Sequence, residues 1–474
     1  MLIGRDNEQK LLLSALDSDE SKFIAVYGRR RVGKTYLIRQ TFKKQFTFSH
    51  TGLYRGNLQE QLFGFSASLR QFGLSDFSPP NNWLEAFELL KDLINTQNNN
   101  EKKIIFLDEL SWMDTTRSDL MLALESFWNG WASARDDIVL IVCASATSWM
   151  LSKVIHNKGG LYNRLAFQLN LKPFSLKQCE EYLAKKGNTM NRHQILQCYM
   201  IMGGIPYYWG LIRNNLSFAQ NIDYIFFSEN APLKNEFNYL FSSIFKHPDS
   251  YIKIIEALGT KKAGMDRNEL LKATNSVNSG SFSTKLDELE SCGFIRQYPE
   301  YGKKKRNTIY QLMDNFVLFY YQFMADKPND VNFWTHQINT PTYNTFCGLA
   351  FERVCLQHIG QIKNALGISA VLSNVCSWKC TRDVDKGING SQVDLLIDRK
   401  DQVINLCEMK FSGQQYSLSK STDENLRHKL NDFINVTQTK SAIHLTLITP
   451  YGLANNSYSG NIQSVITEDD LFNS

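Results

Sequence analysis

The sequence lacks the long apolar runs from which membrane-spanning helices are made. Of its 474 residues 43% are hydrophobic, but no stretch approaches the roughly 18 residues that a span needs. The opening segment, MLIGRDNEQKLLLSAL, is charged and reads as a strand end entering a helix, so it does not look like a secretion signal. We therefore expect a cytoplasmic protein with no membrane partner.

Paired cysteines are missing as well. The nine cysteines include no C-x-x-C pair, and no cluster of histidines accompanies the two closest ones, Cys376 and Cys380. This spacing argues against a zinc site. Free thiols without a secretion signal are typical of a reducing compartment.

A strong charge of one sign is also absent. The 52 basic and 47 acidic residues leave a net charge of +5, which is mild for this size. Such a balance permits contact with nucleic acid but does not argue for it. The length itself is too great for one core and suggests about three domains.

The octapeptide GRRRVGKT has the spacing of a phosphate-binding loop. It follows an apolar run, KFIAVY, and precedes a segment with helical spacing, which is the strand–loop–helix context that this motif requires. Gly28 and Gly33 would let the backbone turn its N–H groups inward, Lys34 would reach the β- and γ-phosphates, and Thr35 would bind Mg²⁺. The variable positions of the loop, to which we assign no individual role, are Arg29, Arg30, Arg31 and Val32.

A second segment of the expected nucleotide site, KKIIFLDEL at residues 102–110, has two carboxylates near its end. The continuous apolar run is typical of a parallel strand buried on both faces. At its end, Asp108 would hold Mg²⁺ through water and Glu109 would orient the attacking water. The alternative is an acidic strand end that caps a helix.

Two further strands are predicted at IVLIVCAS, residues 138–145, and at FQLNLKPF, from residue 167. Ser145 ends the first and is placed to sense the γ-phosphate, unless it is an ordinary turn serine. Between the strands, Arg164 is the candidate to approach a phosphate in its own subunit or in a neighbouring one. A surface arginine paired with an acid is the alternative. Action on a neighbour would require a homo-oligomer.

The N-terminal segments together resemble the AAA+ ATPases, in particular the family called archaeal-type ATPases. The likeness rests on IGRDNEQKLL, the arginine-rich phosphate loop, LDEL, PFSLKQCEEYL, and the GGIP of YMIMGGIPYYW. It implies an α/β fold, a doubly wound parallel sheet with a helical lid over residues 1–235, and an ATPase that uses ATP and Mg²⁺.

The middle of the chain, residues 236–330, is predicted to be a winged helix-turn-helix. Three helical segments are followed by a strand, a basic loop and a returning strand. Either this module grips DNA or it serves as a contact between proteins. The basic side chains that would touch phosphates are Lys285, Lys303, Lys304, Lys305 and Arg306.

The C-terminal part, residues 335–474, contains a predicted hairpin made of VDLLID, a polar turn and VINLCEMKF. Counting back from the turn sets Asp394 opposite Glu408, and Lys410 shares a face with Glu408. Carboxylates within an apolar sheet are costly to bury without a partner. Asp394, Glu408 and the carbonyl of Met409 can bind Mg²⁺ or Mn²⁺, with Lys410 activating or steadying a water and Glu352, on an upstream helix, at the rim.

These features resemble the PD-(D/E)XK nuclease superfamily over about residues 340–460, which implies a restriction-endonuclease-like α/β domain. The alternative is a carboxylate–lysine salt bridge in a fold without metal. The whole sequence thus predicts an ATP-driven DNA-processing protein in which an ATPase is coupled to a metal-dependent nuclease. The competing hypothesis is a regulatory switch whose C-terminal domain binds nucleic acid or protein without cutting it.

Overall fold

The computed structural model describes residues 2–97, 101–157, 159–245, 247–261, 264–303, 308–326, 328–383, 385 and 388–473. The chain divides into two compact units. One comprises Met1–Pro173 with Ser243–Lys246, and the other comprises Phe174–Ser242 with His247–Ser474. This division falls inside the first predicted domain, so the three domain bounds stay a prediction.

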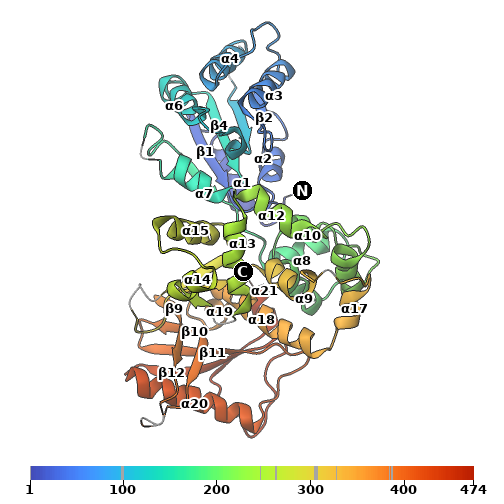
Figure 1. Cartoon of the computed structure of the whole chain (residues 1–474), viewed down its shortest axis with the longest axis vertical. Coiled ribbons are helices and arrows are strands. Elements are labelled where there is room, and N and C mark those ends of the chain that lie inside the picture. Colours follow the sequence, from blue (N-terminus) through green and yellow to red (C-terminus); the bar gives the residue numbers. More distant parts are fainter. Residues whose placement is uncertain are drawn as a thin grey trace. The chain divides into compact units, whose positions relative to one another are not determined.

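The first unit is built on a five-stranded parallel sheet with the strand order β2-β3-β4-β1-β5 (Figure 1). The central strands are buried along almost their whole length, as expected for a parallel sheet covered on both faces. The sheet confirms the predicted α/β fold with a parallel sheet. Its strands are β1 (Lys22–Tyr27), β2 (Phe48–Thr51), β3 (Lys103–Asp108), β4 (Ile138–Ala144) and β5 (Phe167–Asn170).

Helices bury their apolar stripes against this sheet. Helix α4 packs against both α3 and α6, and aromatic side chains such as Phe65, Phe87 and Phe127 fill the space between them. Asn57 and Glu60 form a capping box that starts α3, which satisfies two backbone donors at that end. The helices are α1 (Asp6–Ser14), α2 (Lys34–Thr41), α3 (Leu58–Gln71), α4 (Trp83–Asn95), α5 (Leu110–Met113), α6 (Leu120–Gly130) and α7 (Thr147–Met150).

The second unit opens with a group of helices in which the GGIP segment has a clear packing role. Gly203 ends a helix at a positive φ of 59°. A Cβ on Gly204 would lie 1.9 Å from the carbonyl oxygen of Phe174, so only glycine permits this approach. The Trp209 indole then donates to the Gly203 carbonyl at 2.7 Å. These helices are α8 (Leu176–Lys185), α9 (Arg192–Met202), α10 (Pro206–Trp209), α11 (Phe218–Ile222) and α12 (Glu236–Ile244).

Three helices and a small antiparallel sheet, ordered β6-β8-β7, follow at residues 249–312. The third helix of this group buries Phe282, Leu286 and Leu289. Lys304, Lys305 and Arg306 lie outside the described residues. The elements are α13 (Asp249–Thr260), β6 (Met265–Asp266), α14 (Arg267–Ala273), α15 (Gly280–Ser291), β7 (Ile295–Tyr298) and β8 (Ile309–Leu312).

The last part of the chain forms a mixed sheet with the order β13-β12-β11-β10-β9. Strands β9, β10 and β11 are antiparallel neighbours, whereas β11, β12 and β13 run parallel. Phe433 of α20 packs on the edge of Trp378 in β9, which closes a small core. The elements from residue 315 on are α16 (Asn315–Phe319), α17 (Phe333–Gln337), α18 (Pro341–Gln357), α19 (Ile359–Ala365), β9 (Ser373–Cys380), β10 (Ser391–Arg399), β11 (Val403–Met409), α20 (Lys420–Thr437), β12 (Ala442–Ile448), β13 (Ser464–Ile466) and α21 (Glu468–Phe472).

The nine cysteines are free thiols, as the sequence predicts. None of the helices in the described residues combines the length and the apolar character that crossing a membrane requires.

Candidate functional site

The loop Gly28–Thr35 joins β1 to α2, in the context that the motif requires. Gly28 has a φ of 138°, and a Cβ there would lie 2.4 Å from the carbonyl oxygen of Leu171. Gly33 has a φ of 93° and immediately precedes α2. Both positions need glycine for conformational reasons. The loop therefore lies at the carboxyl end of a central parallel strand, where open α/β sheets bind their ligands.

Lys34, the first residue of α2, is buried and its ammonium group is held by three oxygens. It donates to the carbonyls of Gly28 at 2.9 Å and Arg29 at 3.0 Å, and to Ser145 Oγ at 3.0 Å. A lysine ammonium has three hydrogens to donate. A bound phosphate would therefore take the place of one of these oxygens.

The ends of β3 and β4 meet the loop at a second set of contacts. Thr35 Oγ1 donates to Asp108 Oδ2 at 2.8 Å. Glu109 adopts a left-handed backbone with φ 49°, and its carboxylate accepts the Ser145 N–H at 3.0 Å and the Ser145 hydroxyl. Lys34, Ser145 and Glu109 thus form one hydrogen-bonded chain across the carboxyl edge of the sheet.

Asp108 is a carboxylate that lacks a full counter-charge. It is buried, and burial, together with the charge of Glu109, raises its pKa, while the hydrogen bond from Thr35 acts in the opposite direction. A divalent cation would relieve this cost. The hydroxyl of Thr35 and the carboxylate of Asp108 are hard oxygen donors of the kind that Mg²⁺ prefers. The residues at this position therefore fit Mg²⁺.

The remaining residues predicted for the loop lie in different surroundings. Val32 and Arg29 are buried, whereas Arg30 and Arg31 are partly exposed, and Arg31 has a positive φ of 67°. Arg164 lies after a turn closed by its N–H on the Leu161 carbonyl, and its side chain is exposed. Its role in approaching a phosphate stays a prediction.

The arrangement of sheet, glycine loop, lysine and acidic strand end defines a P-loop ATPase. A family model described as an ATPase domain predominantly from Archaea matches residues 2–212. This part of the chain is similar to archaeal-type ATPase domains.

Several individual proteins are similar to this chain. An uncharacterized protein of Methanocaldococcus jannaschii is 26% identical over 366 residues, which is 76% of this chain and 77% of that protein. A Walker-type ATPase of Pyrococcus abyssi covers 67% of this chain and 95% of its own length, at 16% identity and a TM-score of 0.45. The ORC2 protein of Aeropyrum pernix covers 72% of this chain and 96% of its own, at 17% identity and a TM-score of 0.44.

In the second unit, Asp394 and Glu408 lie on the neighbouring strands β10 and β11 of a hairpin. Leu395 pairs with Cys407, and Asp394 and Glu408 are the next residues of the two strands. That their side chains share one face stays a prediction. Lys410 Nζ lies 2.8 Å from Glu408 Oε1, so these two side chains lie together.

Glu408 has a second basic partner that the sequence did not assign to it. Lys429 of α20 donates to Glu408 Oε2 at 2.8 Å. Although burial acts to raise the pKa of Glu408, Lys429 and Lys410 hold it below its ordinary value. The amphipathic pattern of α20 predicts that Lys429 lies on a helix that packs against the sheet. No pattern in the sequence identifies Glu408 as the partner of this lysine.

These residues fit a divalent cation only in part. Asp394 and Glu408 are hard donors on neighbouring strands, and the carbonyl of Met409 follows Glu408 in the sequence. However, both oxygens of Glu408 already accept from lysines. Within the part of the chain that the structure describes, no three or more His, Cys, Asp or Glu side chains come together in a way that could hold a metal ion. Glu352 interacts electrostatically with Lys410 and remains a candidate for the rim.

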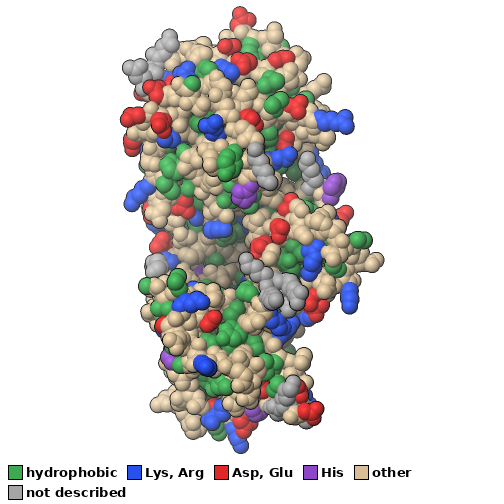
Figure 2. Space-filling model, turned by 90° about the vertical axis from the view of Figure 1, so that its left-hand side faces the viewer, with side chains coloured by type: hydrophobic (Ala, Val, Ile, Leu, Met, Phe, Trp, Pro, Cys, Tyr) green, Lys and Arg blue, Asp and Glu red, His purple; other side chains and the backbone are tan. Residues whose placement is uncertain are grey.

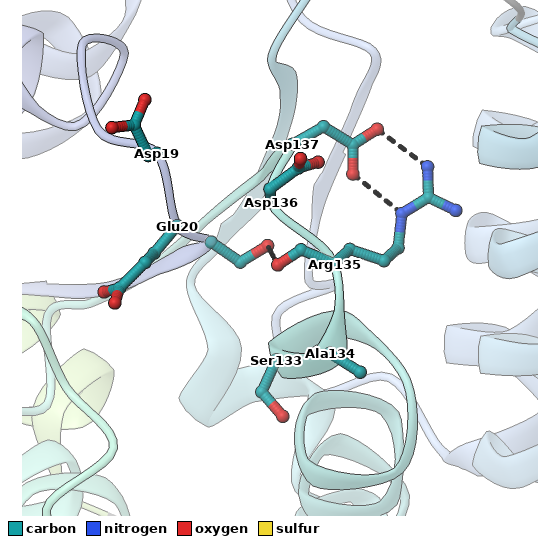
Figure 3. Close-up of a pocket in the computed structure, with 8 residues that line it drawn as sticks. Asp19, Glu20, Ser133, Ala134, Arg135, Asp136 and Asp137 are labelled. Atoms are coloured by element: carbon teal, nitrogen blue, oxygen red, sulfur yellow. Dashed lines mark hydrogen bonds and ion pairs between the residues drawn. The ribbon is translucent and has the colours of Figure 1, made fainter.

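An acidic pocket of about 580 Å³ lies at the other end of the ATPase sheet, where β1 and β4 begin. In Figure 3 the guanidinium of Arg135 points at the carboxylate of Asp137, and the two are joined at 2.7 Å. Because the phosphate loop follows the carboxyl end of β1, this pocket is separate from the nucleotide site.

Among the described residues on the face drawn in Figure 2, the basic side chains form no continuous stripe. On the face drawn there, Lys and Arg side chains are interspersed with Asp and Glu side chains. On this face, therefore, contact with a polyanion would depend on a local group of basic side chains.

Proposed function

We propose that the chain is an ATP-dependent DNA-processing protein. In this proposal the archaeal-type ATPase domain binds and hydrolyses ATP, and the face carrying Asp394, Glu408 and Lys410 cleaves phosphodiester bonds. The observation that supports the proposal is the pairing of β10, which carries Asp394, with β11, where Lys410 lies 2.8 Å from Glu408.

At the nucleotide site each residue has a task that its contacts support. Lys34 would exchange a loop oxygen for the β- and γ-phosphates, and Thr35 and Asp108 would hold Mg²⁺, which supplies charge neutralisation when bound. Loss of the Lys34 contact would leave Ser145 and Glu109 as a separate pair. Glu109 would then orient the attacking water, with Ser145 reporting the presence of the γ-phosphate.

At the second site the hairpin residues would hold a divalent cation, Mg²⁺ or Mn²⁺, through Asp394, Glu408 and the Met409 carbonyl. The cation supplies Lewis acidity when bound. Although burial acts to lower the pKa of Lys410, Glu408 raises it above its ordinary value. Lys410 would therefore stay an ammonium and steady the attacking water as a hydrogen-bond donor, while Glu352 would orient groups at the rim.

Two further parts of the proposal concern partners. Residues 236–330, with three helices and an antiparallel sheet, would act as a winged helix that links the two sites or grips DNA through Lys285 and Lys303. Because its side chain is exposed, Arg164 would act on the phosphate of a neighbouring subunit, which makes the active form a homo-oligomer.

A regulatory switch without cleavage is the second candidate. It is favoured by the two lysines that occupy both oxygens of Glu408, because a carboxylate saturated in this way does not need a metal. In that case the C-terminal domain would bind nucleic acid or protein, and ATP would control the binding.

Nicking of supercoiled plasmid by the purified full chain separates these candidates. With Mg²⁺ or Mn²⁺ the wild type should nick the DNA, and Asp394→Ala should abolish nicking without changing ATP hydrolysis. Lys34→Ala provides the matched control, because it should remove ATP hydrolysis and leave the hairpin intact. Nicking that persists in Asp394→Ala would refute the nuclease, and the absence of nicking in the wild type would favour the switch.

A further inference from the structure

Asp394 lies at an irregularity in the sheet. Strand β10 pairs with β9 at Val393 and again at Leu396, and the register shifts between these two residues. A bulge of this kind turns a side chain in a new direction. The side chain of Asp394 is only partly exposed, and it accepts one hydrogen bond, from Gln392 Nε2 at 2.6 Å.

The segment after β7 is attached to β9 beside this irregularity. Tyr301 donates its N–H to the Ser377 carbonyl at 2.8 Å, and Ser377 donates to the Pro299 carbonyl at 3.2 Å. Ser377 lies between the two β9 residues that flank the register shift, Cys376 and Trp378. Strand β7 is therefore brought next to Asp394 by backbone hydrogen bonds.

Two arginines converge at this point from different elements. Arg296 of β7 donates through Nε to Gln311 Oε1 at 2.9 Å, and its guanidinium lies 4.2 Å from the centre of the Tyr298 ring. Arg353 of α18, which is 3% exposed, donates through Nε to the neighbouring Leu312 carbonyl at 2.8 Å. Arg353 also donates through Nη1 to the Leu349 carbonyl at 2.9 Å, so these contacts hold both side chains in place.

Arg353 interacts electrostatically with Glu352 first and then with Asp394, and Arg296 interacts with Tyr298, Arg353 and Asp394. Burial lowers the pKa of Arg296 to about 10 and also lowers that of Arg353. A buried cation is costly, and an anion placed beside it recovers part of that cost. A guanidinium also matches the geometry of a phosphate group.

We propose that Arg296 is a receptor for a backbone phosphate of a nucleic-acid strand that lies against Asp394, with the buried Arg353 adding its positive charge from behind. The inference rests on the proposed function insofar as it places a strand at the Asp394–Glu408 face. It adds a residue of β7 to that face, so residues 236–330 would contribute to the site through a strand rather than only through a DNA-binding helix.

The first test measures binding of a fluorescein-labelled 30-base-pair DNA duplex to the full chain by anisotropy, in EDTA so that no cleavage occurs. Arg296→Gln should weaken binding roughly tenfold, as expected for loss of a charge-assisted hydrogen bond. The slope of log K against log salt should fall by about 0.9, the value for one phosphate contact. Arg399→Gln is the matched control, because Arg399 is paired with Asp401 at the opposite end of the same hairpin.

The second test uses a change of opposite sign. Asp394→Asn removes a negative charge that would repel the phosphate in EDTA, so it should tighten DNA binding roughly threefold to tenfold. The gain should vanish when Arg296→Gln is added. If Asp394 is instead only the structural counter-ion of the arginines, Asp394→Asn should lower the melting temperature without tightening binding, which would overturn the proposal.

The outcomes separate this inference from the proposed nuclease. Binding and salt slope unchanged in Arg296→Gln would refute the receptor even if Asp394→Ala abolishes nicking. Weakened binding in Arg296→Gln would support the receptor even if the wild type nicks no plasmid. If the receptor binds a phosphate group, inorganic phosphate at millimolar concentration should compete with the duplex. The competition should be equal in wild type and Arg399→Gln and weaker in Arg296→Gln. If the Arg296→Gln variant does not fold, the direction in which Asp394→Asn changes DNA binding decides the proposal by itself.

Discussion

Thr35 and Asp108 lie 73 positions apart in the sequence, and the Thr35 hydroxyl donates to the Asp108 carboxylate at 2.8 Å. This bond joins the start of α2 to the end of β3. It puts a hydroxyl and a carboxylate at the position where a magnesium ion would be held beside the phosphate loop. The contact forms because the neighbouring parallel strands β1, β4 and β3 end at the same edge of the sheet.

Replacing Asp108 should separate function from stability. Asp108→Asn should lower ATP hydrolysis at least 100-fold, because a ligand of the cation is lost. Since burial raises the pKa of Asp108, the ionised form destabilises the nucleotide-free fold at neutral pH, and the neutral amide should raise its melting temperature. ATP turnover and thermal unfolding with and without Mg²⁺ check both parts. A lower melting temperature in the absence of Mg²⁺ would contradict the account of Asp108.

Two glycines offer a matched test of close packing. Gly204→Ala should destabilise the fold by about 3 kcal/mol or more, because the new Cβ would lie 1.9 Å from the Phe174 carbonyl oxygen and the backbone would have to move. Gly130→Ala should be neutral or stabilising by about 0.5–1 kcal/mol, because this helical position has no atom within 4 Å of the added carbon and alanine favours a helix. Urea unfolding measures both, and equal effects of the two changes would be inconsistent with the packing described.

The lysines on Glu408 predict a pH-dependent contribution to stability. The pKa of Glu408 is lowered, so its contribution is present above the unfolded pKa of about 4.3 and is lost as the pH falls through the folded value. Glu408→Gln should therefore cost about 1–3 kcal/mol at pH 7, and the difference from the wild type should shrink below pH 4. Urea midpoints across this range test it. A difference that does not change with pH would show that the carboxylate charge is not responsible.

Removing Lys429 should favour a cation on Glu408. Lys429→Met frees Glu408 Oε2 and removes a nearby positive charge, so Mn²⁺ affinity should rise roughly tenfold, which corresponds to about 1.4 kcal/mol. Isothermal titration of the nucleotide-free chain measures it. Arg427→Met is the control, since this residue of the same helix is paired with Asp423 at 2.9 Å. The gain should disappear in the double variant with Asp394→Ala, and a gain that persists there would assign the cation to another site.

His358 should make the fold sensitive to mild acid. Burial lowers its pKa to about 4, with Leu176 N–H donating to Nε2 at 3.2 Å and Nδ1 donating to the Val354 carbonyl at 2.8 Å. The unfolded chain takes up a proton near pH 6.5 while the folded chain does not, so stability falls between pH 6.5 and 4. The loss is up to about 3 kcal/mol. His358→Gln should flatten this slope in urea unfolding at pH 7 and pH 5, and an unchanged slope would exclude His358 as its source.

The sequence by itself determined the features whose chemistry is contiguous in the chain. The glycine loop with Lys34 and Thr35 is one segment, and its strand and helix follow from local periodicity. The hairpin register follows from the position of its turn, because pairing in an antiparallel ribbon counts outward from that point. The pairing of β10 with β11 was therefore predictable without any tertiary contact, and the opposition of Asp394 and Glu408 stays a prediction from that count.

Tertiary structure alone decided which distant side chains meet these segments. Strand β2 is too short and too polar at Ser49 and His50 to stand out in the sequence, and it becomes a strand by pairing with β3. Other elements supply Ser145, which accepts from Lys34, and Lys429, which donates to Glu408. Other elements also supply the arginines of β7 and α18, which interact electrostatically with Asp394. Their positions depend on how helices and sheets pack, since a contact between residues far apart in the chain leaves no local pattern for a single sequence to reveal.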